Sequence, residues 1–366
     1  MTATDQNIIV GICWTMCPIE ELRFRSKHNL LHSFEKEPKP GVQKGRNKLN
    51  LTEHGNICVK EFRRSAAGEN VSNPKTLRTP EVLLETIEYL FSNILFRKDA
   101  HFNFTYDFIF DRLRSVRQDT VIQQLHKVRP MVCVAILERC VRFYIYAAYR
   151  TKLNPEMAID LHINTQHTVD CLKTLLLLYN DMEYRFREQV KLQHRLSMVA
   201  VYMLLHIQNH DVLCGLMINV PNRLWKLEPL KTVLEMAFAV MHKNYVRFIK
   251  LTSKLVSEKR YVILLTLCLC IDRLRVDCIQ MLCHSHNSKA CSFSAQDLCS
   301  WLFLNNASSA THLCNELGLT CPQPNVIKFF KSDFIHKDTN KVHGCNLIKT
   351  VQQLNNDEII NILRYP

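Results

Sequence analysis

Two clusters of cysteine and histidine contain residue types that bind metal ions. Cys13 and Cys17 are separated by three residues, a spacing that paired zinc ligands use, but no matching pair follows nearby. We expect the two thiols, with Trp14 and Met16, to be buried on the helical body as an apolar anchor instead. The second cluster contains Cys283, His284 and His286, with Cys278, Cys291 and Cys299 around it. Its spacing fits no zinc-finger or zinc-ribbon pattern, so we expect a helix end with exposed histidines, with a tetrahedral metal site as the alternative.

The motifs of common enzyme classes are missing from the sequence. It contains no glycine-rich phosphate loop, no Gly-x-Ser-x-Gly and no His-Glu-x-x-His. The adjacent acids Glu20 and Glu21 lie among charged residues, in surroundings that do not suit general acid–base catalysis. We therefore predict a protein that is not an enzyme and that needs no metal and no cofactor.

Three arginines within two helical turns could contact phosphate. At about 100° per residue, Arg114 and Arg117 share one face of a helix, while Arg112 projects elsewhere. Three acids are close enough in sequence to pair with them: Asp107, Asp111 and Asp119. Two interpretations follow, phosphate contact or an intramolecular ion network that braces this helix against the N-terminal arm, and we favour the network.

A second set of basic residues lies in a C-terminal winged helix that the pattern predicts. Helices are expected from Phe293 to about Leu304 and from Ser308 to Leu317, the second closed by Gly318. Residues 326–331 are expected to form a strand, with residues 347–351 as its hairpin partner.

The second of these helices contains no Lys or Arg, which does not favour sequence-specific reading of bases. The ribbon is basic, with Lys328, Lys331, Lys337, Lys341 and Lys349 against two acids. We expect these lysines to bind nucleic acid through phosphates, independently of sequence. The alternative is a solvated edge whose lysines prevent strand-to-strand aggregation.

The remainder of the chain indicates helices. Only 8 of 366 residues are glycine, 47% are hydrophobic, and the net charge is +13. Residues 1–78 lack periodicity and are expected to form an extended basic arm on the body. Apolar residues then recur at spacings of three and four, which predicts an irregular helical solenoid over residues 79–290. The winged helix, over residues 291–366, would cap it. Cysteines in apolar stretches, no signal sequence and no apolar run of about 20 residues indicate a soluble protein with free thiols.

Several segments, in this order, resemble the SAC/GANP family of mRNA-export scaffolds, in particular its short SAC-domain-containing type. The first three span residues 11–18 (GICWTMCP), 59–68 (VKEFRRSAAG) and 106–119 (YDFIFDRLRSVRQD). Weaker similarities follow at residues 137–143, 164–181, 243–248 and 314–319. The likeness implies that the motif residues are structural anchors: Cys13, Trp14, Met16, Cys17, Pro18, Arg63, Arg112, Arg114 and Arg117.

The resemblance also implies a fold and a function. Family members have a PCI-type architecture, a TPR-like helical solenoid capped by a winged helix. They act as scaffolds in nuclear mRNA processing and export, where a second PCI protein, braced by a small acidic DSS-type protein, pairs through the winged helices. The joint surface binds the backbone of RNA or DNA. The alternative that the family implies is a scaffold for centrosome duplication or the mitotic spindle, which would place the protein at the centrosome or in the cytoplasm.

Overall fold

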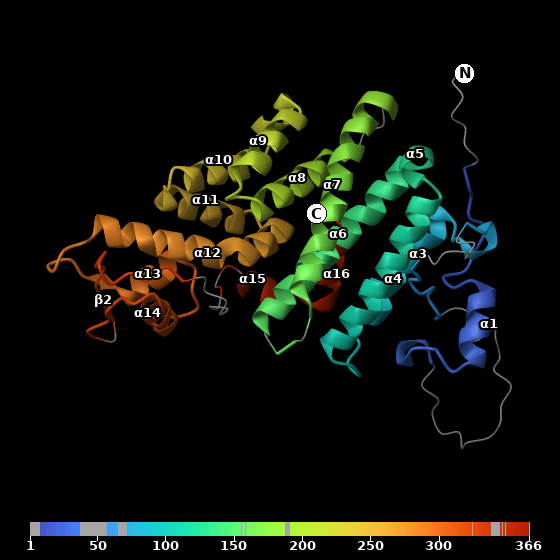
Figure 1. Ribbon diagram of the computed structural model, residues 1–366, viewed down its shortest axis with the longest axis horizontal. Coiled ribbons are helices and arrows are strands. Elements are labelled where there is room, and N and C mark those ends of the chain that lie inside the picture. The colour runs from blue at the N-terminus through green and yellow to red at the C-terminus, as the bar shows by residue number, and fades with distance from the viewer. Residues whose placement is uncertain are drawn as a thin grey trace, which may run out of the picture. The chain divides into compact units, whose positions relative to one another are not determined.

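The computed structural model describes residues 8–36, 57–64, 72–154, 156–157, 159–186, 191–323, 325–337, 345, 347 and 349–365 (Figure 1). The chain forms two compact units, Met1–Val141 and Arg142–Pro366, and the boundary falls within helix α6 (Pro130–Leu153). The sequence-based division after residues 78 and 290 stays a prediction. Within the described residues, no helix is long and apolar enough to cross a bilayer.

The first unit holds short N-terminal elements against one long helix. Its elements are α1 (Ile19–Lys27), η1 (Ser33–Glu35), η2 (Pro74–Thr76), α3 (Pro80–Tyr89), η3 (Leu90–Ile94), α4 (Phe102–Ile122), α5 (Leu125–Val128) and the first part of α6. The start predicted for α3 is confirmed, because the Thr79 side chain accepts a hydrogen bond from Val82 N and Pro80 is the first helical residue. An extended stretch joins the arm to this region through the bonds Ile12 N to Pro74 O and Cys13 N to Leu77 O, both 3.0 Å.

The second unit begins with stacked helices. They are α7 (Leu161–Asp181), η4 (Met182–Phe186), α8 (Leu192–Leu205), α9 (His210–Asn219), η5 (Asn222–Lys226), α10 (Leu230–Met241), α11 (Tyr245–Ser257) and α12 (Tyr261–Ser285). Helix α8 packs against α7, α10 and α12, and α10 packs against α11. Helices that contact their neighbours in this way bury a continuous core, which confirms the predicted mainly α fold with a helical solenoid.

The C-terminal elements have the order strand, helix, helix, strand that a winged helix uses. They are β1 (Phe293–Ser294), α13 (Ala295–Trp301), α14 (Ala307–Glu316) and β2 (Val326–Ile327), followed by α15 (Lys349–Gln352) and α16 (Asn356–Arg364). Gly318, with φ +83°, follows α14 as predicted. One apolar core joins the sheet, α13 and α14 to α12, and it includes Ile279, Leu298, Leu313 and Ile327.

The hairpin expected in this region is wrong. Strand β2 pairs in antiparallel fashion with β1, in the register Phe293 to Ile327, and not with residues 347–351. Part of that segment is helix α15, and its buried Leu347 and Val351 lie four residues apart, which is a helical spacing. The partner strand of β2 in the small sheet is therefore β1, which directly precedes α13.

Candidate functional site

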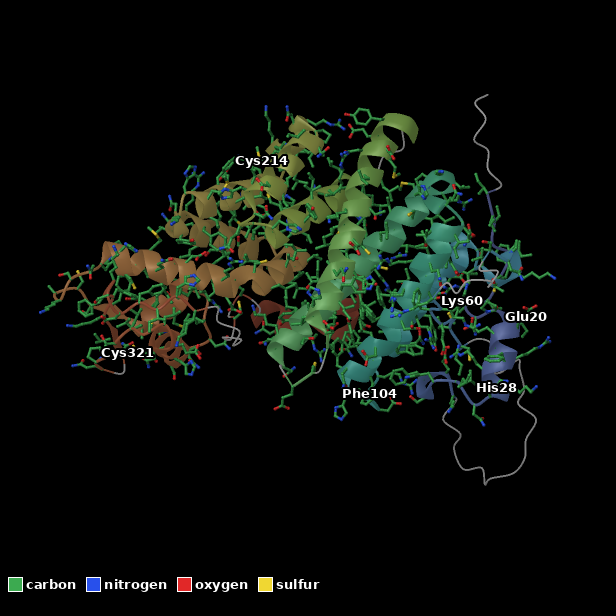
Figure 2. The ribbon with its side chains drawn as sticks, in the orientation of Figure 1. Glu20, His28, Lys60, Phe104, Cys214 and Cys321 are labelled. Carbon is green, nitrogen blue, oxygen red and sulfur yellow. The ribbon has the colours of Figure 1, made fainter. Side chains whose placement is uncertain are left out.

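The three opening sequence motifs meet in the first unit, where Figure 2 labels Lys60 near α4. Lys60 Nζ lies 2.6 Å from Asp119 Oδ1, and Phe62 N donates to Asp111 Oδ2 at 3.2 Å. Gly11 N donates to Gln123 Oε1 at 2.9 Å. The N-terminal arm is therefore held on α4 by polar contacts at three points along the helix.

A fully buried carboxylate lies at the centre of this arrangement. Glu35 forms ion pairs with Arg25 and with Arg112, whose Nη2 lies 3.2 Å from Glu35 Oε1. Its oxygens also accept hydrogen bonds from the backbone N–H groups of His32 and Val59, at 3.0 and 3.1 Å. A buried charge is tolerated where opposite charges and hydrogen bonds satisfy it, and every oxygen of Glu35 has such a partner.

Glu61 joins the two arginines on the outer side of this cluster. Its Oε1 lies 3.1 Å from Arg25 Nη2 and 3.2 Å from Arg112 Nη2. Burial disfavours the charged Arg25 guanidinium, but Glu35 and then Glu61 outweigh burial and raise its pKa. We call Arg25, Glu35, Glu61 and Arg112 the Glu35 cluster.

The arginine side chains of α4 make contacts with other residues of the same chain. Arg112 is buried in the Glu35 cluster, with its guanidinium 4.5 Å from the centre of the Phe108 ring. The Arg114 guanidinium lies over the Phe62 ring at 3.9 Å. Arg117 is half-buried and has a partner, and Arg63 is exposed with its carbonyl bound to Gln118 Nε2. Of the acids expected to pair with these arginines, Asp111 pairs with Arg112 at 2.5 Å, whereas Asp119 pairs with Lys60 and Arg78.

The expected burial of Trp14 is wrong. Its side chain is 73% exposed, whereas Cys13, Cys17 and Pro18 are buried and Met16 is half-buried. The stretch is extended, so neighbouring side chains point to opposite sides. Cys13, in a β-bridge with Arg78, faces inward, and Trp14 therefore faces outward.

The cysteine clusters behave as packing groups. Burial raises the pKa of Cys17, so its thiol stays neutral. Cys283 is buried in the core beneath the winged helix, and burial raises its pKa to about 11, while His284 is exposed at the end of α12. Among the described residues, no group of three or more His, Cys, Asp or Glu side chains is arranged to hold a metal ion.

The five predicted lysines are not gathered on one ribbon. Lys328 Nζ donates to the carbonyl of Lys289 at 3.1 Å, and Lys331 is exposed, with its backbone N–H on Asn287 Oδ1. Lys349 is the first residue of α15 and so lies in a helix, not in a strand.

The remaining two lysines lie elsewhere. Lys337 lines a cleft of the second unit, and Lys341 is outside the described residues. The loop that ends α12 supplies a further exposed cation, Lys289, which the sequence analysis missed because it precedes β1. Pairing of β1 with β2 brings this loop to Lys328.

Comparison with known proteins gives a consistent result along most of the chain. The model of the SAC3/GANP family matches residues 16–323. Protein xmas of Drosophila melanogaster is 26% identical over 246 residues, which cover 66% of this chain and 11% of that protein. SAC3 family protein 1 of Schizosaccharomyces pombe is 28% identical over 204 residues, 56% of this chain and 18% of the relative.

A plant relative extends the similarity. SAC3 family protein B of Arabidopsis thaliana is 22% identical over 321 residues, 86% of this chain and 17% of that protein. The chain therefore spans less than a fifth of the length of each of these curated relatives. Because the family model covers far more than half of the sequence, the chain belongs to the SAC3/GANP family.

Proposed function

We propose that this protein is a non-enzymatic, PCI-type scaffold of nuclear mRNA processing and export. It pairs with a second PCI-domain protein and a small acidic DSS-type protein, and it holds RNA or DNA by phosphate contacts that do not depend on sequence. The observation that carries the proposal is the family match over residues 16–323, in a helical chain that ends in a winged helix.

The surface chemistry supports a binding role. The net charge of +13 favours an anionic partner, and Lys289 and Lys331 are exposed on the winged-helix side of the second unit. Helix α14 presents no Lys or Arg, which agrees with contacts to phosphates and not to base edges. Its exposed His312 lies beside Glu316, with 3.7 Å between Nδ1 and Oε1.

Affinity purification of a tagged chain tests the scaffold. At moderate salt and after nuclease treatment, we expect a PCI-domain protein and a small acidic protein in stoichiometric amounts by mass spectrometry. Recovery of centrosomal or spindle proteins without these two would contradict the proposal and favour the centrosomal alternative.

Two matched aspartate substitutions locate the pairing surface. Leu313→Asp places a carboxylate in the winged-helix core, where the leucine is 1% exposed, and should abolish recovery of the PCI partner. Ile218→Asp makes the same chemical change on α9 at an 84% exposed position and should retain the partner. Loss of the partner with Ile218→Asp alone would place the pairing surface on the solenoid.

A further inference from the structure

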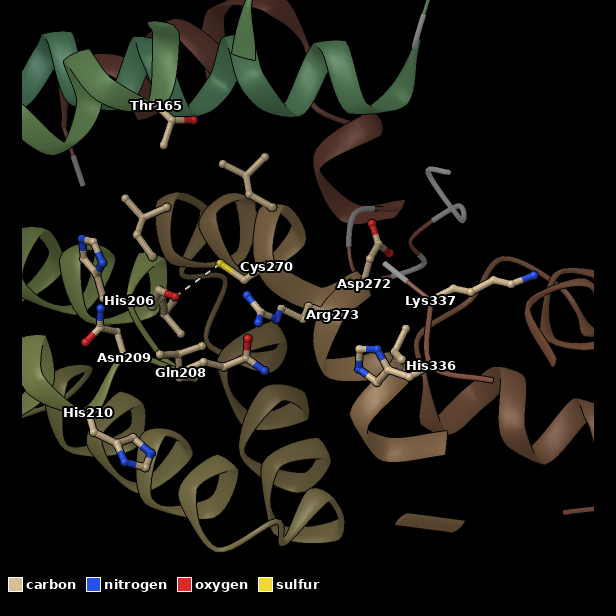
Figure 3. A pocket seen from close by; sticks show the side chains of 15 residues that line it. Thr165, His206, Gln208, Asn209, His210, Cys270, Asp272, Arg273, His336 and Lys337 are labelled. Atoms are coloured by element: carbon tan, nitrogen blue, oxygen red, sulfur yellow. Dashed lines mark hydrogen bonds between the residues drawn. The ribbon is translucent and has the colours of Figure 1, made fainter. Parts of the chain in front are cut away.

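A cleft of about 850 Å³ opens in the second unit (Figure 3). Four separate segments line it: Thr165 of α7, the turn between α8 and α9, the middle of α12, and residues 336–337. None of the four carries a binding motif in the sequence, so only the fold brings them together.

The positive charge of Arg273 is not balanced by Asp272, the acid that lines the same cleft. Arg273 is exposed on α12, and in Figure 3 its guanidinium lies toward the middle of the lining residues. Within the described part of the chain it has no ion pair or hydrogen bond. The neighbouring Asp272 is neutralised, because its oxygens lie 2.6 Å from Lys152 Nζ and 2.7 Å from Arg275 Nη1. Lys337 also lines the cleft and is exposed, and in Figure 3 its side chain extends away from Arg273.

Three imidazoles complete the lining. His210 and His336 are exposed on opposite sides of Arg273 in Figure 3. His206 is half-buried, and its Nε2 is buried with no hydrogen-bond partner in the part of the chain that the structure describes. Burial, and then the charge of Lys173, lower the pKa of His206. At neutral pH it is therefore an uncharged ring whose Nε2 is enclosed by the protein.

Cations combined with flat rings are the elements that bind single-stranded nucleic acid. Arg and Lys contact phosphates, and imidazole rings stack on unpaired bases. A duplex is a rigid rod that could touch only the rim of a concave site, whereas a flexible single strand can enter it. An acidic peptide would satisfy the cations but would leave the exposed rings without a stacking partner.

We propose that this cleft binds single-stranded nucleic acid, with Arg273 and Lys337 on phosphates and His210 and His336 against bases. The inference rests on the proposed function and gives it a location that shares Lys337 with the predicted basic ribbon but not Lys328 or Lys331. It also assigns a binding role to residues of the solenoid itself.

Fluorescence anisotropy with the full chain tests the site, using labelled 15-nucleotide oligo-U, oligo-dT and a duplex of equal length. Arg273→Glu should weaken binding of the single strands about tenfold and reduce the salt slope by about one. His336→Ala should weaken binding by a similar factor through loss of stacking. The matched control is Lys250→Glu, the same change of charge at an exposed position on α11, which should alter affinity less than twofold.

Equal losses with Arg273→Glu and Lys250→Glu would overturn the cleft, because the effect would then be one of net charge. Duplex binding as tight as single-strand binding, or no binding of any oligonucleotide, would overturn it as well. So would tighter binding of a poly-glutamate peptide that is lost with Arg273→Glu, since this would identify an acidic protein as the ligand.

One further variant and one further measurement separate the loss of a contact from charge reversal and from unfolding. Arg273→Gln removes the positive charge without adding a negative one, and a melting temperature equal to that of the wild type shows that the variants are folded. The scaffold proposal is judged separately by recovery of the PCI partner after nuclease treatment, so either idea can fail without the other.

Discussion

Arg112 and Glu35 are 77 residues apart in the chain, yet Arg112 Nη2 lies 3.2 Å from Glu35 Oε1 in the buried part of the first unit. Arg25 of α1 pairs with the same carboxylate. One acid thus connects α1, the turn at residues 33–35 and α4. Residues of the family motifs therefore have a clear structural role, which is to hold the N-terminal arm against the helices.

Removing the charge of Glu35 should destabilise the protein strongly. In Glu35→Gln, two buried arginines are left without their central partner, and breaking a buried pair in this way costs about 3–5 kcal/mol. Urea denaturation measures the loss. The matched control is Glu81→Gln, since Glu81 pairs with Arg129 at the surface and its loss should cost at most about 1 kcal/mol. Equal costs for the two variants would show that the Glu35 cluster does not stabilise the unit.

The exposed position of Trp14 gives a second prediction. Trp14→Ala should change the free energy of unfolding by less than about 0.5 kcal/mol, because the ring is largely in solvent. Phe34→Ala should cost about 3–5 kcal/mol, because that ring is buried and packs edge-on against Phe108 with 5.4 Å between ring centres. Thermal or urea unfolding of the pair checks this, and a large loss with Trp14→Ala would mean that the indole is buried.

The stability of the first unit should fall in mild acid because of His32. Burial, and then Arg112, lower the pKa of His32, and its Nδ1 accepts a hydrogen bond from Phe34 N at 3.2 Å. The folded protein therefore binds fewer protons than the unfolded chain as pH falls below about 6.5, so folding stability decreases until the pH is below the pKa of the folded state.

His32→Asn should weaken this dependence, because an amide can accept the same bond without titrating. Melting temperatures of both proteins at pH 7.5 and pH 5.5 measure it, and the other histidines contribute equally to both. An identical pH dependence in the two proteins would exclude His32 as its source.

Two glycines should respond oppositely to alanine. Gly318 has φ +83°, and an added Cβ would overlap the carbonyl oxygen of Asp333. Gly318→Ala should therefore cost at least about 2 kcal/mol. Gly215, within α9, has open space around it, so Gly215→Ala should stabilise the helix by about 0.5–1 kcal/mol. Thermal unfolding of the two variants tests this, and a tolerated Gly318→Ala would mean that the turn after α14 can be rebuilt.

The lysines near the sheet give a prediction about nucleic acid. Lys331→Glu, alone or with Lys328→Glu, should weaken RNA binding without a change in melting temperature. The salt slope should fall by about one for each phosphate that the protein no longer neutralises. Lys231→Glu, at an exposed position on α10, serves as the control for net charge. An unchanged affinity and an unchanged slope would remove these lysines from the binding surface.

Local features of the sequence were enough to predict the helical character of the chain. The cap Thr79, the first-turn Pro80 and the terminal Gly318 act within a single helical turn, so their neighbours in sequence are also their neighbours in space. Recurring apolar spacing predicted the stacked helices for the same reason. The order of the motifs then indicated the family, and the family indicated a PCI-type fold and a function that periodicity alone does not predict.

Other features depended on contacts between distant segments. The inward face of the extended stretch was decided by its bridge from Cys13 to Arg78, which left Trp14 in solvent. The partner of β2 was decided by the position of β1, which pairs Phe293 with Ile327, 34 residues later in the chain. The cleft around Arg273 combines four segments that share no pattern. A side chain's burial and partners depend on which segments the packed core brings beside it, and this is a property of tertiary structure that local spacing does not encode.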